Sequence, residues 1–532
     1  MKIKLPVLVL IILLAAFLRF YQLGRNPPSL DWDEASLGYN AYSILKTGAD
    51  EYGNRWPISF RSFGDFKPPL YIYLTVPSVA IFGLNEFSVR FPSAVAGLLT
   101  VLMTYFLVKE LSGRSLLALL SSFFLAISPW HLQFSRVAFE ANVALLFFVA
   151  GTWLFLKGLK DGLFFLFSFF FFLASLYTYH SPRLVVPLFL LGLLIYFRKE
   201  LLKELKWLVF SIIFGLLLLF PFVKSFQSAG TARFSSVTSL SPESLNRSIQ
   251  LQDEDLKAGR WWGRIIHNRR FIYLQSFVGG YLDHFNFDFL FLKGDAPGRH
   301  HAVDMGMLYL LDFPFILAGI YCLIGQKVKN NFVIFWWFLV APVASALTSG
   351  TPHAVRSLLY LPTYQIFTAY GILRVYEIFK ENKKKIFLTL LSTFYFLLFT
   401  FYLDLYYVHT SQEYSQWWQY GYKDVVEEVS RIEKDYGKVI TTYRYDQPHI
   451  YFLFYQKVDP AWYQKNWGGG EIKRFERSFG KYEFRNIDWE KDKNFKNVLI
   501  VGTPQEIPEG ATGLIKEVKF LDGQVAFRIV AR

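Results

Sequence analysis

The stretch that decides the fold is Asp31-Trp32-Asp33-Glu34-Ala35-Ser36, which places three carboxylates just after the first apolar run of the chain. That run, residues 4–20, is long enough to cross a bilayer, so the acids lie immediately outside a membrane span. Ionisable groups at a membrane boundary are costly unless they are paired, hydrated or used, which makes function the first hypothesis for such a cluster. We therefore interpret the rest of the chain as a pocket built around these acids.

The composition indicates a polytopic membrane protein with a soluble part attached. Of the 532 residues, 53% are hydrophobic and 19% are aromatic, and apolar runs of about 20 residues recur along the chain. The net charge of +14 comes mostly from short basic clusters between these runs, which is typical of topology signals and argues against a nucleic-acid partner. The single cysteine, Cys322, excludes an intrachain disulfide and a cysteine-based metal site.

The apolar runs predict about eleven transmembrane helices. They lie near residues 4–20, 88–108, 115–130, 139–156, 162–179, 184–197, 207–223, 305–325, 331–348, 357–376 and 386–404. A signal peptide at 5–18 is the alternative for the first run, but Arg19 directly after it favours an uncleaved span.

A cytoplasmic N-terminus places the basic clusters on the inner side, as the positive-inside rule requires. These clusters are Lys2 and Lys4; Lys109 and Arg114; Lys157 and Lys160; Arg198, Lys199, Lys203 and Lys206; Lys327 and Lys329; and Lys380, Lys383, Lys384 and Lys385. The odd number of spans then puts the C-terminal part outside the cytoplasm, and the expected location is the cell (inner) membrane.

The run 70–83 is ambiguous, because counting it as a span would invert every later loop. We interpret it as a helix lying in the membrane interface and opened by Lys67-Pro68-Pro69, since proline is favourable at a helix start. Residues 35–47 are predicted to form a second, amphipathic surface helix. The first outer loop, 21–87, thus holds the acids between two surface helices.

Two further regions complete the predicted organisation. A second large outer loop, 225–304, is rich in Trp and Arg and ends in histidines; it favours a headgroup surface or a stacked sugar, and plain interfacial anchoring is equally compatible. Residues 1–410 form the membrane module, and 411–532 form a small α/β domain. In that domain the pattern predicts a helix at 422–436, strands at 438–445 and 497–501, and a hairpin of 518–520 with 525–530 around Asp522-Gly523.

Three short outer loops each carry one isolated arginine, Arg136, Arg183 or Arg356. The topology rule discourages basic residues on this side, so each needs a reason. One reason is structural pairing, for example of Arg136 with Glu140 four residues later. The other is an anionic ligand, since Arg binds phosphate in a planar, bidentate way. We favour a shared anion, because the three lie at one membrane level with Lys67.

The outer face therefore offers carboxylates and cations together. A transfer reaction with a phosphate leaving group would use such a set: a carboxylate takes the proton of the attacking hydroxyl, and cations stabilise charge on the leaving phosphate. The alternative for Asp33 is an N-cap of the 35–47 helix, with Glu34 acting on its first turn. A divalent metal site from His284, His300, His301 and Asp304 is a further hypothesis, although their spacing fits no strong ligand motif.

Several of these motifs together resemble the GT-C membrane glycosyltransferases. They are Asp33-Glu34 after the first span, Lys67-Pro68-Pro69, residues 85–92 (NEFSVRFP), and Arg136 with Glu140. The nearest resemblance, over roughly 1–410, is to the bacterial protein O-mannosyltransferase-like group, related to the lipid A aminoarabinose transferases.

The resemblance implies a polyprenyl-phosphate sugar donor, transfer with inversion, and a protein, lipid or glycan acceptor among membrane lipids. It implies that Asp33 is the base, that Glu140 and Glu34 belong to the catalytic group, and that Lys67 contacts the donor phosphate. The carry-over to Arg183, His353 and Arg356 is looser, and Arg136, which belongs to the motif with Glu140, is also counted among the residues that bind the donor phosphate. Glu140 stands where the aminoarabinose transferases have Asp. The resemblance leaves a divalent metal open, because some relatives bind one and others do not.

Two other classes of protein compete with a glycosyltransferase. A flippase for lipid-linked glycans would need polar groups through the whole bilayer depth and is often built from inverted repeats, whereas here the ionisable residues gather at one level. A membrane anchor for a binding domain at 411–532 would leave the first outer loop unexplained. Lipid movement without sugar transfer would favour the flippase, and full function of the isolated tail would favour the anchor.

Overall fold

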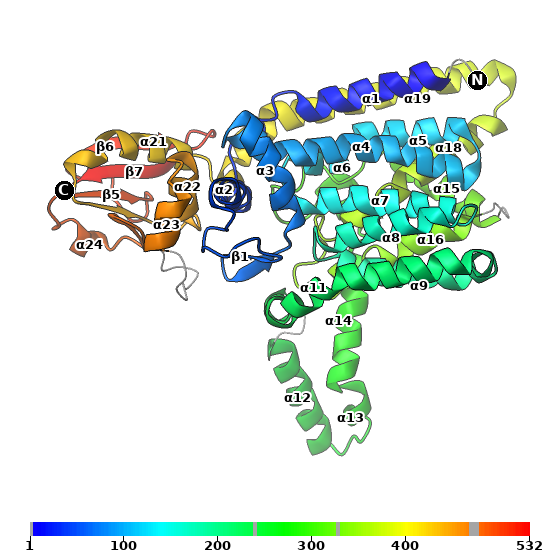
Figure 1. Ribbon diagram of the computed structural model, residues 1–532, viewed down its shortest axis with the longest axis horizontal. Coiled ribbons are helices and arrows are strands. Elements are labelled where there is room, and N and C mark those ends of the chain that lie inside the picture. The colour runs from blue at the N-terminus through cyan, green and yellow to red at the C-terminus, as the bar shows by residue number, and fades with distance from the viewer. Residues whose placement is uncertain (1–3, 238–241, 326–329, 468–477) are drawn as a thin grey trace.

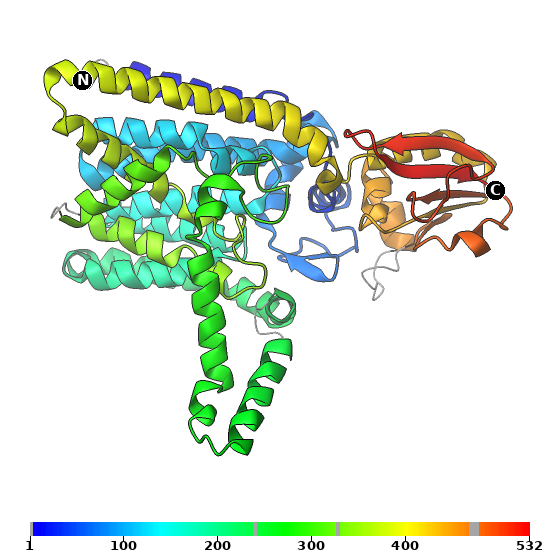
Figure 2. The ribbon, with the colours of Figure 1, turned by 180° about the vertical axis from the view of Figure 1, so that it is seen from behind.

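The computed structural model describes residues 4–237, 242–325, 330–467 and 478–532. Its apolar helices run side by side as a bundle, and the C-terminal sheet lies beyond one end of that bundle (Figure 1). The surface helices α2 (Trp32–Thr47) and α3 (Leu70–Phe82) lie between the two parts, as the reverse view also shows (Figure 2). Of the predicted inner clusters, Lys2, Lys327 and Lys329 fall outside the described residues.

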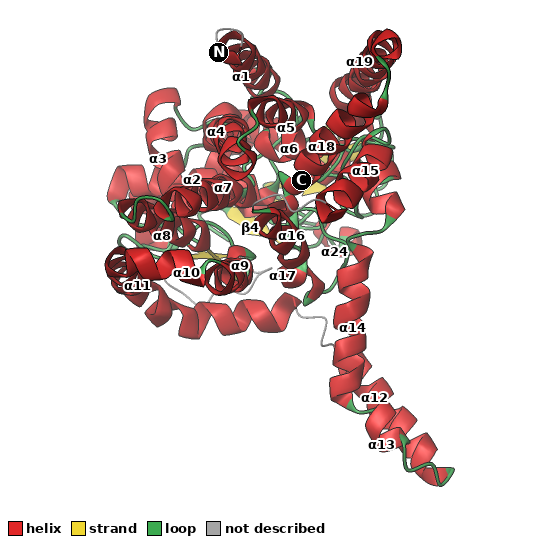
Figure 3. Cartoon of the chain, turned by 90° about the vertical axis from the view of Figure 1, so that its right-hand side faces the viewer, coloured by secondary structure: helices red, strands yellow, loops and turns green. Residues whose placement is uncertain are grey.

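The bundle confirms a multi-pass membrane protein but not a count of eleven spans. Four segments of the described chain are long and apolar enough to cross a membrane: Glu86–Ser112, Glu140–Gly158, Arg198–Pro221 and Glu381–Glu413. A bent pair, α5 with α6, can add a fifth, and six further apolar helices are shorter. In the end-on view α1 and α19 stand apart from each other at the edge of the bundle (Figure 3). The count of eleven therefore stays a prediction.

The bundle helices have these bounds: α1 Lys4–Phe20, α4 Glu86–Ser112, α5 Ser115–Ile127, α6 Pro129–Ser135, α7 Glu140–Gly158, α8 Leu163–Leu176, α9 Pro182–Tyr196, α10 Arg198–Leu201, α11 Leu205–Val237, α15 Asp312–Gly325, α16 Asn331–Val340, α17 Val343–Ala346, α18 Thr363–Ile378 and α19 Glu381–Asp404.

Two predicted boundaries in the bundle were wrong. The run 115–130 bends by 60° between α5 and α6, because Ser128 caps a new helix that begins with Pro129. The second outer loop does not begin at 225, since α11 continues to Val237. That loop then forms a helical arm that points away from the bundle (Figure 1). The arm consists of α12 (Pro242–Lys257), α13 (Gly263–Ile266) and α14 (Arg269–Asp283).

The start of α2 is determined by a capping box. The Asp31 side chain accepts a hydrogen bond from the backbone N–H of Glu34, at 2.8 Å, and Glu34 accepts one from the N–H of Asp31, at 3.3 Å. The N-cap is therefore Asp31, and the suggestion that Asp33 caps this helix was wrong. The cap lets the Asp33 side chain take other partners.

The surface helices are packed tightly against both neighbouring parts. Tyr71 of α3 donates to the carbonyl of Val89 on α4, at 2.9 Å. On α2, a Cβ at Gly38 would lie 2.6 Å from the Phe454 ring and 2.5 Å from Val89, so only glycine permits this close approach. A short antiparallel hairpin, β1 (Phe60–Ser62) with β2 (Asp65–Lys67), connects the two helices.

The C-terminal region is a five-stranded sheet with helices, in the order β4-β3-β5-β7-β6. Strand β3 (Lys438–Thr441) runs parallel to β4 (Tyr482–Phe484) and β5 (Val498–Gly502), whereas β7 (Val525–Ala531) is antiparallel to β5 and to β6 (Leu514–Lys519). The helices are α20 Thr410–Glu413, α21 Tyr422–Ile432, α22 Pro448–Tyr455, α23 Pro460–Asn466 and α24 Trp489–Asp492. The predicted hairpin is present, and β4, α22 and α23 were not predicted.

Candidate active site

A cavity of about 280 Å³ lies where the bundle meets the surface helices. It collects side chains from six separate segments, and these are the start of α2, the β1–β2 hairpin, the start of α7, the α8–α9 turn, and the loops near 297–300 and 353–356. The lining residues are Asp31, Trp32, Asp33, Ser62, Phe63, Asp65, Lys67, Pro68, Phe139, Glu140, Tyr179, His180, Pro297, Arg299, His300, His353, Val355 and Arg356.

Three of the predicted site residues meet around one ammonium group. The Lys67 Nζ lies 2.7 Å from Asp33 Oδ1 and 3.7 Å from Glu140 Oε1. Burial by itself would lower the pKa of Lys67, but the carboxylates of Asp33 and Glu140 raise it above its ordinary value, so the amine stays protonated. The Asp33 side chain is 45% exposed, against 11% for Glu140. Asp33 is therefore the acid of this group that a ligand reaches most easily.

A second ion pair also lines the cavity, and the sequence did not single out its cation, Arg299. Arg299 NH1 is 3.3 Å from Asp31 Oδ2, and its guanidinium carbon is 4.4 Å from the centre of the Trp32 ring. Burial raises the pKa of Asp31 to about 7, although Arg299 acts in the opposite direction. The only signal for Arg299 in the sequence was its place in the Arg- and His-rich end of the second outer loop.

The cavity lining also includes His353, Arg356, Tyr179 and His180. Arg356 donates to Thr348 Oγ1 at 2.7 Å and to the Ser349 carbonyl at 2.8 Å, and it still lines the cavity. Arg183 does not line the cavity, because its NH1 contacts His180 Nδ1 at 2.9 Å from behind. Burial and the charge of Arg183 lower the pKa of His180 to about 3, which keeps the imidazole neutral.

Glu34 and Arg136, which were also predicted for the site, lie beneath the cavity rather than in it. Glu34 is held by Arg90 through two contacts of 2.9 Å and by the Ala138 N–H at 2.9 Å. Both charged side chains are buried, with Glu34 2% and Arg90 0% exposed.

Arg136 is likewise fully engaged in holding backbone segments together. It donates to the carbonyls of Leu18, at 2.6 Å, and Asn26, at 3.0 Å, and to the Tyr406 hydroxyl at 3.1 Å. The suggested pairing of Arg136 with Glu140 is not formed, since Glu140 faces Lys67. We interpret Glu34 and Arg136 as residues that position the cavity walls.

A group that fits a divalent cation lies at one edge of the cavity. Ligand atoms of Asp295, His300 and His353 lie within 4.8 Å of one another. The Asp295 Oδ2 accepts from His300 Nδ1 at 2.7 Å and from the Ala354 N–H at 2.8 Å. Its other oxygen, Oδ1, is buried and makes no hydrogen bond with any residue that the structure describes. One carboxylate and two imidazoles form a common ligand set for zinc.

The metal set predicted from sequence was wrong in three of its four members. His284 Nε2 contacts Ser345 Oγ at 2.7 Å, His301 contacts the carbonyls of Asp295 and Ala302, and Asp304 is exposed. Only His300 belongs to the observed group, since adjacent residues in a loop point in different directions.

A helical bundle has a polar cavity at one end, lined in part by the start of α2 and the β1–β2 hairpin, and a sheet region follows it. The class with this arrangement is the GT-C fold of membrane glycosyltransferases. The crystal structures of ArnT from Cupriavidus metallidurans share it. The apo form superposes with a TM-score of 0.55 at 13% identity and covers 98% of this chain and 97% of that one. The Archaeoglobus fulgidus oligosaccharyltransferase with a tethered acceptor peptide gives a TM-score of 0.53, over 94% of this chain and 69% of that one, at 13% identity. The predicted resemblance in fold is confirmed.

Within this class, residues 66–224 match the family described as "Dolichyl-phosphate-mannose-protein mannosyltransferase". A Bacillus subtilis protein named "Putative mannosyltransferase YkcB" is 29% identical over 209 residues, which are 38% of this chain and 28% of that protein. An uncharacterised Aquifex aeolicus protein is 30% identical over 141 residues, 26% of this chain and 27% of that protein. The chain thus matches less than a third of the length of these relatives.

Proposed function

We propose that this protein is a membrane glycosyltransferase, which passes a sugar from a polyprenyl-phosphate donor to a hydroxyl group of an acceptor. The observation that carries the proposal is the meeting of Asp33, Lys67 and Glu140 with Arg299 and Arg356 in one cavity at the end of an apolar bundle. A lipid-linked donor would have its phosphate and sugar in such a cavity and its chain among the helices. One ArnT structure with this fold, at a TM-score of 0.56, is described as bound to undecaprenyl phosphate.

In this proposal each polar residue of the cavity has one role in the reaction. The acceptor oxygen attacks the anomeric carbon from the side opposite the phosphate, the bond from that carbon to the phosphate oxygen breaks, and the configuration inverts. Asp33 takes the hydroxyl proton, since it is the most exposed carboxylate of its group. Lys67, Arg299 and Arg356 stabilise the negative charge that develops on the leaving polyprenyl phosphate. Glu140 holds Lys67 beside Asp33.

The remaining predicted phosphate ligands have supporting positions in this proposal. Arg183 orients His180 on the cavity wall, and His353 belongs to the group with Asp295 and His300. A divalent cation bound by that group would supply an additional positive charge next to the phosphate. An oligosaccharyltransferase from Archaeoglobus fulgidus that was crystallised with Zn and sulfate has a similar fold, with a TM-score of 0.50. We would therefore test zinc first.

The proposed orientation places this cavity at the extracytoplasmic face of the cell membrane, with the N-terminus inside and the C-terminal domain outside. Its support is the distribution of basic clusters along the chain. The acceptor, whether a protein, a lipid or a glycan, would approach between the bundle and the C-terminal domain, because α2, which carries Asp33, lies there (Figure 1).

The test uses membranes of a producing strain from which the chromosomal gene has been deleted, so that donor and acceptor are retained. Purified protein is added, and the conversion of polyprenyl-phosphate sugar to polyprenyl phosphate is followed by mass spectrometry. We expect Asp33→Asn to lower the rate about 10²–10⁴-fold, the usual contribution of a general base. The matched control is Asp304→Asn, an exposed acid with φ of 52°, a conformation that Asn tolerates.

A rate of Asp33→Asn within twofold of the wild type would remove Asp33 as the base. Movement of the lipid-linked sugar across vesicles without release of polyprenyl phosphate would instead favour the flippase.

A further inference from the structure

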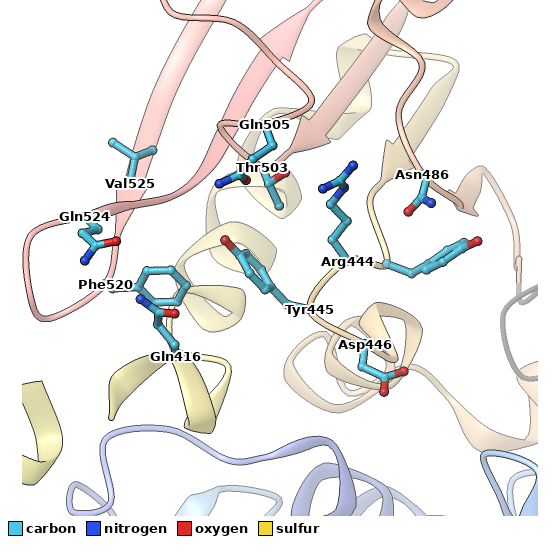
Figure 4. A pocket seen from close by; sticks show the side chains of 11 residues that line it. Gln416, Arg444, Tyr445, Asp446, Asn486, Thr503, Gln505, Phe520, Gln524 and Val525 are labelled. Carbon is cyan, nitrogen blue, oxygen red and sulfur yellow. The ribbon is translucent and has the colours of Figure 1, made fainter. Parts of the chain in front are cut away.

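A second and larger cleft, of about 640 Å³, lies in the C-terminal domain. It is formed by the loops that follow the parallel strands β3, β4 and β5, together with the turn of the β6–β7 hairpin and a helical turn, η5 (Ser415–Trp418). Its lining residues are Gln416, Tyr443, Arg444, Tyr445, Asp446, Asn486, Thr503, Gln505, Phe520, Gln524 and Val525 (Figure 4). The carboxyl ends of parallel strands are a frequent place for ligands in α/β sheets.

One buried carboxylate joins all three strand-end loops. Glu506 accepts from Thr442 Oγ1 after β3, at 2.9 Å, from the Ile487 N–H after β4, at 3.1 Å, and from the Thr503 N–H after β5, at 3.0 Å. Its partner Arg444 is 3.3 Å away. Glu506 is only 7% exposed, so these contacts keep the floor of the cleft in a single arrangement before any ligand arrives.

The backbone at the edge of the cleft is also constrained. Asp446 and Gln447 have φ values of 64° and 45°, a left-handed conformation that non-glycine residues rarely adopt. Two such residues in succession cost free energy, and residues of this kind gather at binding sites. The preceding Tyr445 ring is fixed edge-on between Phe520, at 5.5 Å, and Phe527, at 5.2 Å.

The side chains that line the cleft define the chemistry of its ligand. Four amides face it, from Gln416, Asn486, Gln505 and Gln524 (Figure 4), and none of them makes a side-chain hydrogen bond with a residue that the structure describes. Each amide offers both a donor and an acceptor, which suits hydroxyl groups. The Tyr445 and Phe520 rings provide apolar faces. The charge of Arg444 is balanced by Glu506, and Asp446 adds a carboxylate to the lining, so the cleft does not favour an anionic ligand.

We propose that this cleft is a binding site for a neutral oligosaccharide. Hydroxyl groups that both donate and accept, set on a ring with apolar C–H faces, match a lining of amides and aromatic rings. A phosphate or an acidic peptide fits less well, because the cationic side chain at the cleft is already paired. If the proposed glycosyl transfer is correct, on which this second step rests, the cleft holds the glycan part of the acceptor.

Contacts between side chains link the elements around the cleft to those around the cavity that contains Asp33. Gln416 of the cleft belongs to η5, and Trp418 at the end of the same turn lies 6.0 Å from the Arg90 guanidinium, which holds Glu34 next to Asp33. Tyr451 of α22 donates to the Leu30 carbonyl at 3.3 Å, one residue before the α2 cap. The turn that lines the cleft and the start of α2 are therefore linked through Trp418, Arg90 and Tyr451.

The experiment measures saccharide binding by the full-length protein in lipid nanodiscs. Saturation-transfer NMR is recorded with neutral trisaccharides of mannose, glucose, galactose and N-acetylglucosamine. We expect at least one of these trisaccharides to bind, and we expect Tyr445→Ala to raise the Kd for that trisaccharide at least tenfold. Because Tyr445 is half-buried, Gln505→Ala is measured as well; Gln505 is exposed, so we expect this variant to fold normally and to lose threefold or more in affinity. The matched control is Gln412→Ala, an exposed glutamine outside the cleft.

The outcomes separate this proposal from the proposed function. No binding of any of the four trisaccharides, or binding that both cleft variants leave unchanged, overturns the saccharide site even if sugar transfer proceeds. Binding that the cleft variants abolish supports the site even if no polyprenyl phosphate is released. In the membrane assay, a higher acceptor KM of Gln505→Ala at an unchanged kcat supports the acceptor role, and an unchanged KM contradicts it.

Discussion

Two ion-pair clusters begin at neighbouring residues of α2 and differ in their exposure and in their partners. Asp33 faces Lys67 in the cavity and is 45% exposed, whereas Glu34 faces Arg90 beneath the cavity and is 2% exposed. Glu34 also serves the capping box and accepts the Ala138 N–H, so each of its oxygens has a structural partner. Asp33 lines the cavity instead, with the more exposed side chain of the two. The comparison shows that an Asp-Glu pair at a membrane boundary can divide chemistry and architecture between its two members.

The largest expected effect that tests this division is on stability. Glu34→Gln leaves the charge of Arg90 buried without its partner, and breaking a buried pair in this way costs about 3–5 kcal/mol. SDS-unfolding equilibria in mixed micelles measure it. The control is Glu86→Gln, which removes a pair at 2.9 Å with Lys423, whose side chain is 47% exposed; the lysine keeps its hydration, so the change should cost about 1 kcal/mol. Equal stabilities of the two variants would show that Glu34 is not a structural residue.

The next effect concerns the cavity cluster and is expected mainly in turnover, with a smaller loss of stability than for Glu34→Gln because Asp33 in this cluster is 45% exposed. Lys67→Met removes one cation that we assign to the leaving phosphate, and the loss of one such donor lowers kcat by about 10²-fold. Arg299 and Arg356 remain, which is why we expect less than the loss for Asp33→Asn. The rate of polyprenyl phosphate release measures this loss. The control is Lys293→Met, because the Lys293 side chain is 75% exposed. A variant that unfolds like Glu34→Gln but turns over normally would reverse the roles of the two clusters.

The smallest effect concerns pH and comes from Asp31. This residue pairs with Arg299 in the cavity and shares the capping box with Glu34. Its pKa rises from about 3.8 to about 7 on folding. Between these values the folded protein keeps a proton that the unfolded chain releases, so this group lowers stability as pH rises from 4 to 7, and its effect is constant above 7.

Asn keeps the helix cap but does not titrate. We therefore expect the Tm of Asp31→Asn, relative to the wild type, to increase from pH 4.5 to 7 and to level off above 7. Thermal scans in one detergent at matched ionic strength measure this difference. A difference that is independent of pH would mean that Asp31 titrates in the same range whether the chain is folded or unfolded.

The fold class could be predicted from the sequence because it depends on local quantities. Apolar run length, basic clusters and Pro68-Pro69 are properties of short segments, and so are the amphipathic pattern of α21 and the Asp522-Gly523 turn. The same holds for the gathering of Asp33, Lys67, Glu140, His353 and Arg356, since residues at one end of parallel helices must share one level. These five all line the observed cavity.

Side-chain direction was decided only by the tertiary structure. Glu34 and Arg136 lie at the correct level yet turn into the protein, because Arg90 and the carbonyls of Leu18 and Asn26 are placed by distant segments. Arg299, Asp295 and the cleft around Glu506 depend on loops that meet only in the folded chain. Membrane depth follows from how many apolar residues precede a group, whereas the partner that a charge finds depends on packing between segments that lie 56 residues apart for Glu34 and Arg90 and more than a hundred apart for the contacts of Arg136.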